Sequence, residues 1–322
     1  MAAVDSFQLL YRQISRSCGF YFEPLALVGA LYAAGKAVIL LRDCSTLVRV
    51  HFLARIIPIK RLTQRFGDWA VINGASEPVA KAYAEELARH GVSIIFVTQD
   101  QSSVRDTAAS LCLSYGIETV VILADLSLGY AASKPVKEAI RGKDIGFLVN
   151  CVESPTSPQS LIEMHEQGLF DLVNKNVAVA TLMTRLVLPG MVQRGRGAVV
   201  NISSGACCRP FPRRVALTAS TGYLDHFSRA LHLEYSGRGI FVQSLTPFQI
   251  AVNRPQSSSS SSSSGEGLFS PKPEVYARHA ISTLGVSNRT TGYWPHTLQC
   301  GLMRCIPEWI WVLGSHMLIG SS

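Results

Sequence analysis

The sequence contains no Cys-x-x-Cys pair and no cluster of histidines at zinc-ligand spacing, although it has eight cysteines and eight histidines. The absence of these patterns excludes the common zinc-finger and thioredoxin-like motifs. Nor are the cysteines dense enough for the disulfide framework of a small secreted protein. We therefore interpret them as reduced thiols of an intracellular protein, and we expect no metal site.

The sequence also lacks a long run of basic residues. Lys and Arg outnumber Asp and Glu by 30 to 22, which gives a formal net charge of +8, but the basic residues are scattered and are not interleaved with aromatic residues. A nucleic-acid interface would gather them on one face or along one segment. The composition therefore indicates a soluble basic surface, and we expect no nucleic-acid partner.

A cleavable secretory signal is absent as well, but the amino-terminal region is apolar and basic. Its most hydrophobic stretch runs from Pro24 to Leu41, which is close to the length of about 20 residues that a spanning helix needs. Lys36 within it would cost roughly 2.5 to 3.5 kcal/mol near a bilayer centre, which favours a peripheral segment. An interfacial helix, a re-entrant anchor and a helix packed on its own protein all remain open. Arg12 and Arg16 add a faint organelle-presequence signal.

From about Gly67 the chain alternates between apolar runs and helical stretches. The runs are short and lack strict period-two alternation, as is typical of strands that are buried on both faces. The predicted strands are 69–72, 92–97, 119–123, 145–149, 198–203 and 240–245, with a helix over 79–90. Repeated strand–helix–strand units predict a Rossmann-like, doubly wound parallel sheet of the α/β class, with any ligand at the carboxyl ends of the strands.

Changes in composition suggest four regions. Residues 1–66 form an apolar targeting or membrane-associated region, and 67–256 form the Rossmann-like domain. Residues 257–267, with eight consecutive serines, have the composition of a flexible linker. Residues 268–322 contain a predicted helix around "EVYARHAISTLG" and an aromatic-rich tail, "IPEWIWVLGSHMLIG", which suits a membrane interface, a hydrophobic groove, the chain's own core or a second subunit.

Four motifs carry a family resemblance. "NGASEPVAK" resembles a glycine-rich cofactor loop, "LADLS" an adenine-contacting acid, "LVNC" an Asn-Asn-Ala-Gly strand end, and "NISSGA" a catalytic serine strand. Over 67–247 the chain thus resembles a short-chain dehydrogenase/reductase of the hydroxysteroid dehydrogenase type. Its two ends resemble an inactive branch of that family. The resemblance implies the fold predicted above and a nicotinamide-dependent ancestry.

The resemblance also implies a catalytic set. The family uses a tyrosine that exchanges a proton with the substrate oxygen, and a lysine four residues later that lowers the tyrosine pKa. A serine about thirteen residues earlier and an asparagine on another helix complete it. Ser204 and Asn176 match the serine and the asparagine, but Leu217 and Thr221 occupy the tyrosine and lysine positions. Leucine has no proton to transfer and threonine carries no charge. Tyr223 should face away from the site, because six residues rotate it about 240° along a helix.

The cofactor loop is degenerate in the same comparison. Gly74 keeps the first glycine and Ala80 takes the last place, but Pro78 replaces the second glycine, and proline has no N–H for a phosphate. Asp125 matches the adenine contact and Asn150 keeps half of the Asn-Asn pair, whereas Asp100 lies one or two residues late for a ribose contact. The remnant comprises Gly74, Ala75, Ser76, Glu77, Pro78, Val79, Ala80, Asp125 and Asn150. We expect that no cofactor is required and that residual NADP binding is weak.

We therefore expect a catalytically inactive homologue that acts by binding or interaction. The alternative is an NAD(P)-dependent oxidoreductase with altered acid/base residues that acts on a steroid or fatty-acyl ketone. The expected partner is an unidentified protein, with membrane association and homo-oligomerisation both open. The resemblance implies a mitochondrial location, and the apolar amino-terminal region would also suit the endoplasmic-reticulum membrane.

Overall fold

The computed structural model describes residues 2–53, 62–128, 130–152, 159–209, 211–251, 267–311 and 314. The chain divides into two compact units, Met1–Arg49 and Val50–Ser322. The second unit begins before residue 67. It includes α3 (Leu62–Phe66), whose residues Leu62 and Phe66 are buried in its core. Most of the predicted serine-rich linker, 257–266, and the end of the aromatic tail lie outside the described residues.

The first unit is one long helix, α1 (Ala2–Val48), with Pro24 inside it. A segment of 30 residues, Pro24–Leu53, has a mean hydropathy of 1.8 in its most apolar window, and none of that window is buried. By length and composition this segment could cross a membrane. The segment contains the apolar run from Pro24 to Leu41 and continues beyond it to Leu53.

The second unit is built on a seven-stranded sheet in which every pairing is parallel. The strands are β1 (Trp69–Asn73), β2 (Ser93–Thr98), β3 (Thr119–Leu123), β4 (Ile145–Cys151), β5 (Gly197–Ile202), β6 (Ile240–Leu245) and β7 (Arg289–Thr290). The first six confirm the predicted strands to within two residues. The two-residue β7, which pairs with Ser244 and Leu245, was not predicted.

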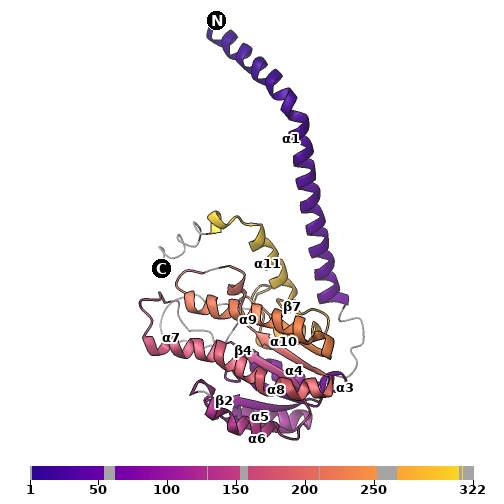
Figure 1. The fold of residues 1–322 in the computed structure, drawn as a ribbon, viewed down its shortest axis with the longest axis vertical. Coiled ribbons are helices and arrows are strands. Elements are labelled where there is room, and N and C mark those ends of the chain that lie inside the picture. Colours follow the sequence, from indigo (N-terminus) through magenta and orange to yellow (C-terminus); the bar gives the residue numbers. More distant parts are fainter. Residues whose placement is uncertain are drawn as a thin grey trace. The chain divides into compact units, whose positions relative to one another are not determined.

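Helices cover both faces of this sheet, as Figure 1 shows. One face packs against α3, α4 (Pro78–Arg89), α5 (Ser102–Tyr115) and α10 (Pro273–Ser282), and the other against α6 (Lys134–Ile140), α8 (Ala180–Arg194) and α9 (Val215–Tyr235). Successive strand residues point to opposite faces, so Ile72 enters the first core and Val71 the second. Both faces are therefore apolar, which explains why the strands lack alternation.

The strand order positions the site. It runs β3-β2-β1-β4-β5-β6-β7, so the chain moves outward in one direction from β1 and in the other from β4. In a parallel sheet the connections leave β1 and β4 toward opposite faces at this switch point and open a crevice at the strands' carboxyl ends. The loop from Asn73 to Pro78 lies at that crevice.

The carboxyl-terminal helix α11 (Trp294–Cys305) carries a fully buried histidine, His296. Its ring lies 5.2 Å from the ring of Tyr293 and 5.9 Å from that of Phe248. Nδ1 accepts a hydrogen bond from the Phe248 amide at 3.4 Å, and Nε2 lies 3.2 Å from the Phe269 carbonyl oxygen, to which it can only donate. The pair of contacts fits the neutral ring, and burial lowers the pKa of His296 to about 4.

The lowered pKa of His296 predicts that the folded protein loses stability in mild acid. Its folded pKa lies below the unfolded value of about 6.5, so its contribution is complete above pH 6.5 and is lost as the pH falls toward about 4. We expect the free energy of unfolding to fall by about 2 kcal/mol between pH 7 and pH 5. Urea unfolding at several pH values measures this.

His296→Gln should flatten that pH profile, because glutamine can accept from Phe248 and donate to Phe269 without titrating near pH 6. The exposed His226 supplies the matched control, and His226→Gln should leave the profile unchanged. An unaltered slope in the His296→Gln protein would show that another group causes the acid sensitivity.

Candidate functional site

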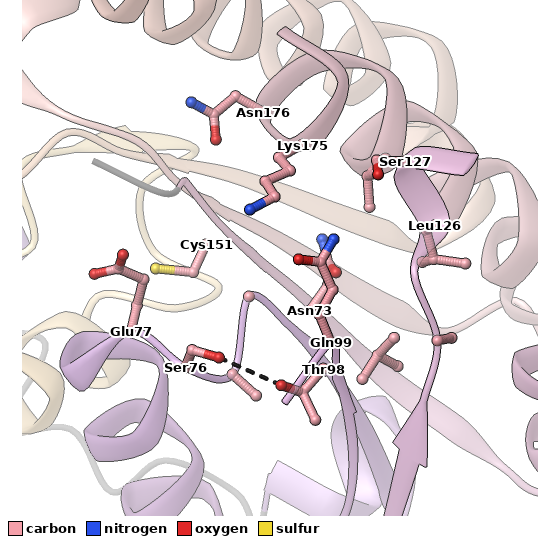
Figure 2. A pocket seen from close by; sticks show the side chains of 15 residues that line it. Asn73, Ser76, Glu77, Thr98, Gln99, Leu126, Ser127, Cys151, Lys175 and Asn176 are labelled. Atoms are coloured by element: carbon pink, nitrogen blue, oxygen red, sulfur yellow. Dashed lines mark hydrogen bonds between the residues drawn. The ribbon is translucent and has the colours of Figure 1, made fainter. Parts of the chain in front are cut away.

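A pocket of about 80 Å³ lies at the carboxyl ends of β1, β2 and β4. Figure 2 shows Ser76 and Glu77 reaching it from the loop before α4, and Lys175 and Asn176 reaching it from the opposite side. The lining residues are Asn73, Gly74, Ala75, Ser76, Glu77, Val97, Thr98, Gln99, Ala124, Leu126, Ser127, Cys151, Lys175, Asn176 and Val179. Of the predicted remnant, Gly74 to Glu77 thus line the pocket, together with Asn176.

The loop keeps the tight turn of a dinucleotide site. Gly74 has φ +76°, and a Cβ there would lie 2.5 Å from the backbone oxygen of Cys151, so no larger residue fits. The Glu77 amide donates to the Gly74 carbonyl at 3.1 Å and closes the turn. Ser76 Oγ lies 3.3 Å from Thr98 Oγ1, which joins the loop to the end of β2 (Figure 2). The turn is therefore held by the chain's own contacts.

Pro78 occupies the first position of α4, as its fixed φ favours. Glu77 is the N-cap and makes no side-chain capping bond, and Ala80 is fully buried behind it. Val79 is half-buried against the sheet core. A helix N-terminus binds anions through its first amides. Here the first of those amides is missing and a carboxylate precedes it, which weakens the site for a phosphate.

The predicted acid, Asp125, does not line the pocket, and one of its carboxylate oxygens accepts three hydrogen bonds. Its Oδ1 accepts from the Ser127 amide at 3.0 Å, from Ser127 Oγ at 2.5 Å and from Gln99 Nε2 at 2.7 Å. The Ser127 hydroxyl bond is the main cause of the lowered pKa of Asp125. Asp100 instead accepts from the amide and hydroxyl of Ser102 at the start of α5 and does not line the pocket.

Asn150 does not line the pocket and is buried between strands β4 and β5. It is 1% exposed, and its Nδ2 donates to Asn201 Oδ1 at 2.9 Å across the β4–β5 pair. Asn201 in turn donates to Ser228 on α9 at 2.8 Å. This buried chain of hydrogen bonds joins two strands to a helix through the Asn150 amide nitrogen, whereas the buried Oδ1 of Asn150 has no hydrogen-bond partner in the described part of the chain.

The two matched catalytic positions differ in their surroundings. Asn176 is buried and lines the pocket from η4 (Asn174–Val179), a π-helical segment of the kind often found at functional sites. Ser204 lies outside the pocket lining, and its Oγ accepts a hydrogen bond from the Ala206 amide at 3.3 Å. Ser204 thereby caps the short helix η5 (Gly205–Cys207).

Leu217 and Thr221 both face the interior of the protein from α9. Leu217 is 3% exposed and packs in an apolar cluster with Val152, Ala180 and Leu224. Thr221 is fully buried, and its hydroxyl donates to the Thr218 carbonyl at 3.0 Å. Neither side chain can take or supply a proton at neutral pH.

Tyr223 lies on another side of α9, as its position in the helix predicted. Its hydroxyl lies 2.8 Å from Thr181 Oγ1, and its ring stacks on Phe227 with centroids 5.7 Å apart. It is absent from the pocket lining. This phenol is therefore engaged elsewhere.

Lys175 also lines the pocket, although its sequence context did not predict this position. Its side chain enters the pocket between Asn176 and the loop (Figure 2), and its charge contributes to the lowered pKa of Asp125 after the Ser127 and Gln99 bonds. The only signal in the sequence is its position directly before Asn176. No group of three or more His, Cys, Asp or Glu side chains in the described part of the chain is arranged to hold a metal ion.

Comparisons with known proteins agree with this architecture. Residues 68–262 match the family model of the short chain dehydrogenases. The chain is 54% identical over 318 residues to "Inactive hydroxysteroid dehydrogenase-like protein 1" of Danio rerio, covering 98% of both chains, and 47% identical over 319 residues to the protein of that name in Homo sapiens, covering 99% of this chain and 96% of the other. A solved 7beta-hydroxysteroid dehydrogenase has a TM-score of 0.67 at 23% identity and covers 76% of this chain and 94% of its own. These matches confirm the resemblance predicted from the sequence.

Proposed function

Because the chain belongs to the short-chain dehydrogenase family, we propose that it is a catalytically inactive member that acts through binding. The relatives named above carry the word "inactive" in their names. The observation that carries the proposal for this chain is the environment of Leu217 and Thr221. An apolar cluster and a backbone-paired hydroxyl stand at the positions that the family resemblance assigns to the tyrosine and lysine.

We further propose that no nicotinamide cofactor is required, because the pocket fits one poorly. Its volume of about 80 Å³ is well below the roughly 300 to 1,000 Å³ of typical small-molecule sites. Pro78 removes an amide from the helix end that would face a pyrophosphate. Thr221 offers a short buried hydroxyl where a lysine would hold the ribose. Residual NADP binding would depend on the adenine side of the pocket, near Thr98 and Asp125.

The alternative, an oxidoreductase with a changed acid/base pair, has less support. It needs a substitute acid near Ser204, and Tyr223 is paired with Thr181. Arg213 contacts Glu163 at 3.3 Å, and a guanidinium does not release its proton at neutral pH. The candidates that the sequence offers therefore do not supply the missing group.

Location and partners are further parts of the proposal. The exposed apolar helix α1 supports membrane association, and the family resemblance favours mitochondria over the endoplasmic reticulum. In this proposal the sheet domain presents a binding surface to a protein partner, either another protein or a second copy of the chain.

A turnover assay tests the proposed inactivity. The purified full-length protein is expected to oxidise NADPH and NADH at the background rate with steroid and fatty-acyl ketones, under conditions in which an active family member shows turnover. Ser204→Ala should leave that rate unchanged. Steady turnover that Ser204→Ala abolishes would establish an enzyme instead and would restore the alternative.

A further inference from the structure

Three cysteine sulfurs lie close together where the end of η5 meets helix α11. Cys208 Sγ lies 3.6 Å from Cys300 Sγ and 4.0 Å from Cys207 Sγ. Cys300 is buried, at 7% exposed, and the other two are half-buried. All three are free thiols in the structure, and Cys208 and Cys300 are 92 residues apart in the chain.

Neighbouring contacts hold the same two segments together. Arg209 donates a hydrogen bond to the Ile306 carbonyl at the end of α11. The Phe211 ring meets the Trp311 ring edge to face, with centroids 5.1 Å apart. These contacts hold the two segments on either side of the sulfurs. The S–S bond of a disulfide is about 2 Å long, so the Cys208 and Cys300 sulfurs, now 3.6 Å apart, need to approach each other by only about 1.6 Å.

We propose that Cys208 and Cys300 form a reversible disulfide when the protein meets a hydroperoxide, and that Cys207 is the thiol that reacts first. The site is a redox-modification site, and its oxidant is hydrogen peroxide or an organic hydroperoxide. Neither the family resemblance nor the pocket described above involves it.

The three thiols differ in acidity in the order that this scheme needs. The hydrogen bond from Cys208 lowers the pKa of Cys207, and the positive charge of Arg289 acts in the same direction. The same bond raises the pKa of Cys208 to about 11, and the bond with Cys208 raises that of Cys300 further. The thiolate is the nucleophile in thiol oxidation, so Cys207 is the sulfur that attacks the peroxide.

The reaction balances in three steps. The Cys207 thiolate attacks one peroxide oxygen, the O–O bond breaks, and an alcohol or water leaves, so that Cys207 becomes a sulfenic acid. Cys208 then attacks the Cys207 sulfur, an S–S bond forms, and the hydroxyl leaves as water with the Cys208 proton. Cys300 finally attacks the Cys208 sulfur and expels Cys207, which takes up the remaining proton. Two thiols and one hydroperoxide thus give one disulfide, one alcohol and one water.

Geometry and leaving-group acidity both drive the last step. A disulfide between adjacent residues is constrained and therefore easily reduced or exchanged. Cys207 also has the lowest pKa of the three, so it leaves most readily. The product ties α11 to the segment that follows Ser204 and closes a loop of about 90 residues in the unfolded chain, which stabilises the folded state.

Peptide mapping of the full-length protein tests this inference. After treatment with hydrogen peroxide and alkylation of the remaining thiols in denaturant, we expect a crosslinked peptide that contains Cys208 and Cys300. We also expect the melting temperature to rise by several degrees and to return to its original value with dithiothreitol.

Single serine variants assign the roles. Cys208→Ser and Cys300→Ser should lose the crosslink, whereas Cys207→Ser should keep it but form it at least tenfold more slowly. The exposed Cys305, also on α11, supplies the matched control, and Cys305→Ser should behave like the wild type. Complete alkylation of Cys300 in peroxide-treated wild-type protein would overturn the disulfide. An unchanged rate in Cys207→Ser would overturn the first step.

Discussion

Titration of NADPH or NADH into the purified protein is expected to show no saturable binding at low micromolar concentrations, and Pro78→Gly is expected to tighten binding at least tenfold. The glycine restores one amide at the first turn of α4 and removes the proline ring from the loop. Each charge-assisted hydrogen bond to a phosphate contributes roughly 1.5 to 3 kcal/mol, so the one restored amide corresponds to a factor of about ten to about two hundred. Nicotinamide fluorescence measures the affinity.

Pro273→Gly is the matched control for this experiment. Pro273 also occupies the first turn of a helix, α10, but neither it nor its neighbours in the chain line the pocket, whereas Pro78 directly follows the lining residue Glu77. The two substitutions should destabilise their helices similarly, and only Pro78→Gly should change the affinity. A wild-type dissociation constant of a micromolar or below would contradict the prediction, and the protein would then be a cofactor sensor. Equal affinities of the two glycine variants would show that Pro78 is not the obstacle.

The strands could be predicted from the sequence because they are buried on both faces of the sheet. Strands such as 145–149 are apolar on both faces and flanked by helical stretches, so the pattern of apolar runs along the chain identifies them as buried strands, whereas their spatial order in the sheet was not predicted. The two-residue β7 has too few residues to show a pattern, and it exists because its backbone pairs with β6. The position of α3 was likewise hidden, because Leu62 and Phe66 become core residues only once Phe147 and its neighbours are in place.

The site was predictable where backbone conformation restricts the residue. Gly74 adopts a positive φ of +76°, which other residues rarely adopt, and the ring of Pro78 fixes its φ, so their sequence positions indicate the turn and the helix start directly. Side chains that depend on tertiary neighbours were not predictable in this way. Asn150, which the sequence places in the cofactor remnant, donates to Asn201 on the next strand, and the sequence does not indicate this contact. Lys175 was overlooked because only the folded chain brings it opposite the loop.

The exposed apolar surface of α1 indicates how this helix associates with a membrane. Lys36 favoured a peripheral segment in the sequence analysis, but the exposed residues Val38, Ile39, Leu40 and Leu41 follow one another around about one full turn. An interfacial helix needs a polar face, whereas a helix that is apolar on all sides suits the bilayer interior. The long side chain of Lys36 can extend toward the headgroups. We therefore propose that α1 spans a membrane.

The full-length protein is expected to sediment with membranes and to resist extraction by alkaline carbonate, and Leu31→Asp combined with Leu40→Asp should move it to the soluble fraction. Both leucines are exposed on α1, and each aspartate costs roughly 2.5 to 3.5 kcal/mol within a bilayer, so the pair opposes insertion by roughly 5 to 7 kcal/mol. The matched control is Leu113→Asp, because Leu113 is 87% exposed on α5 of the sheet domain and its substitution should leave the fractionation unchanged. Release of the wild-type protein by carbonate would instead establish a peripheral segment, as Lys36 alone suggests. Fractionation of cells that express the three proteins separates these outcomes, because the double aspartate variant differs from wild type only if α1 itself enters the bilayer.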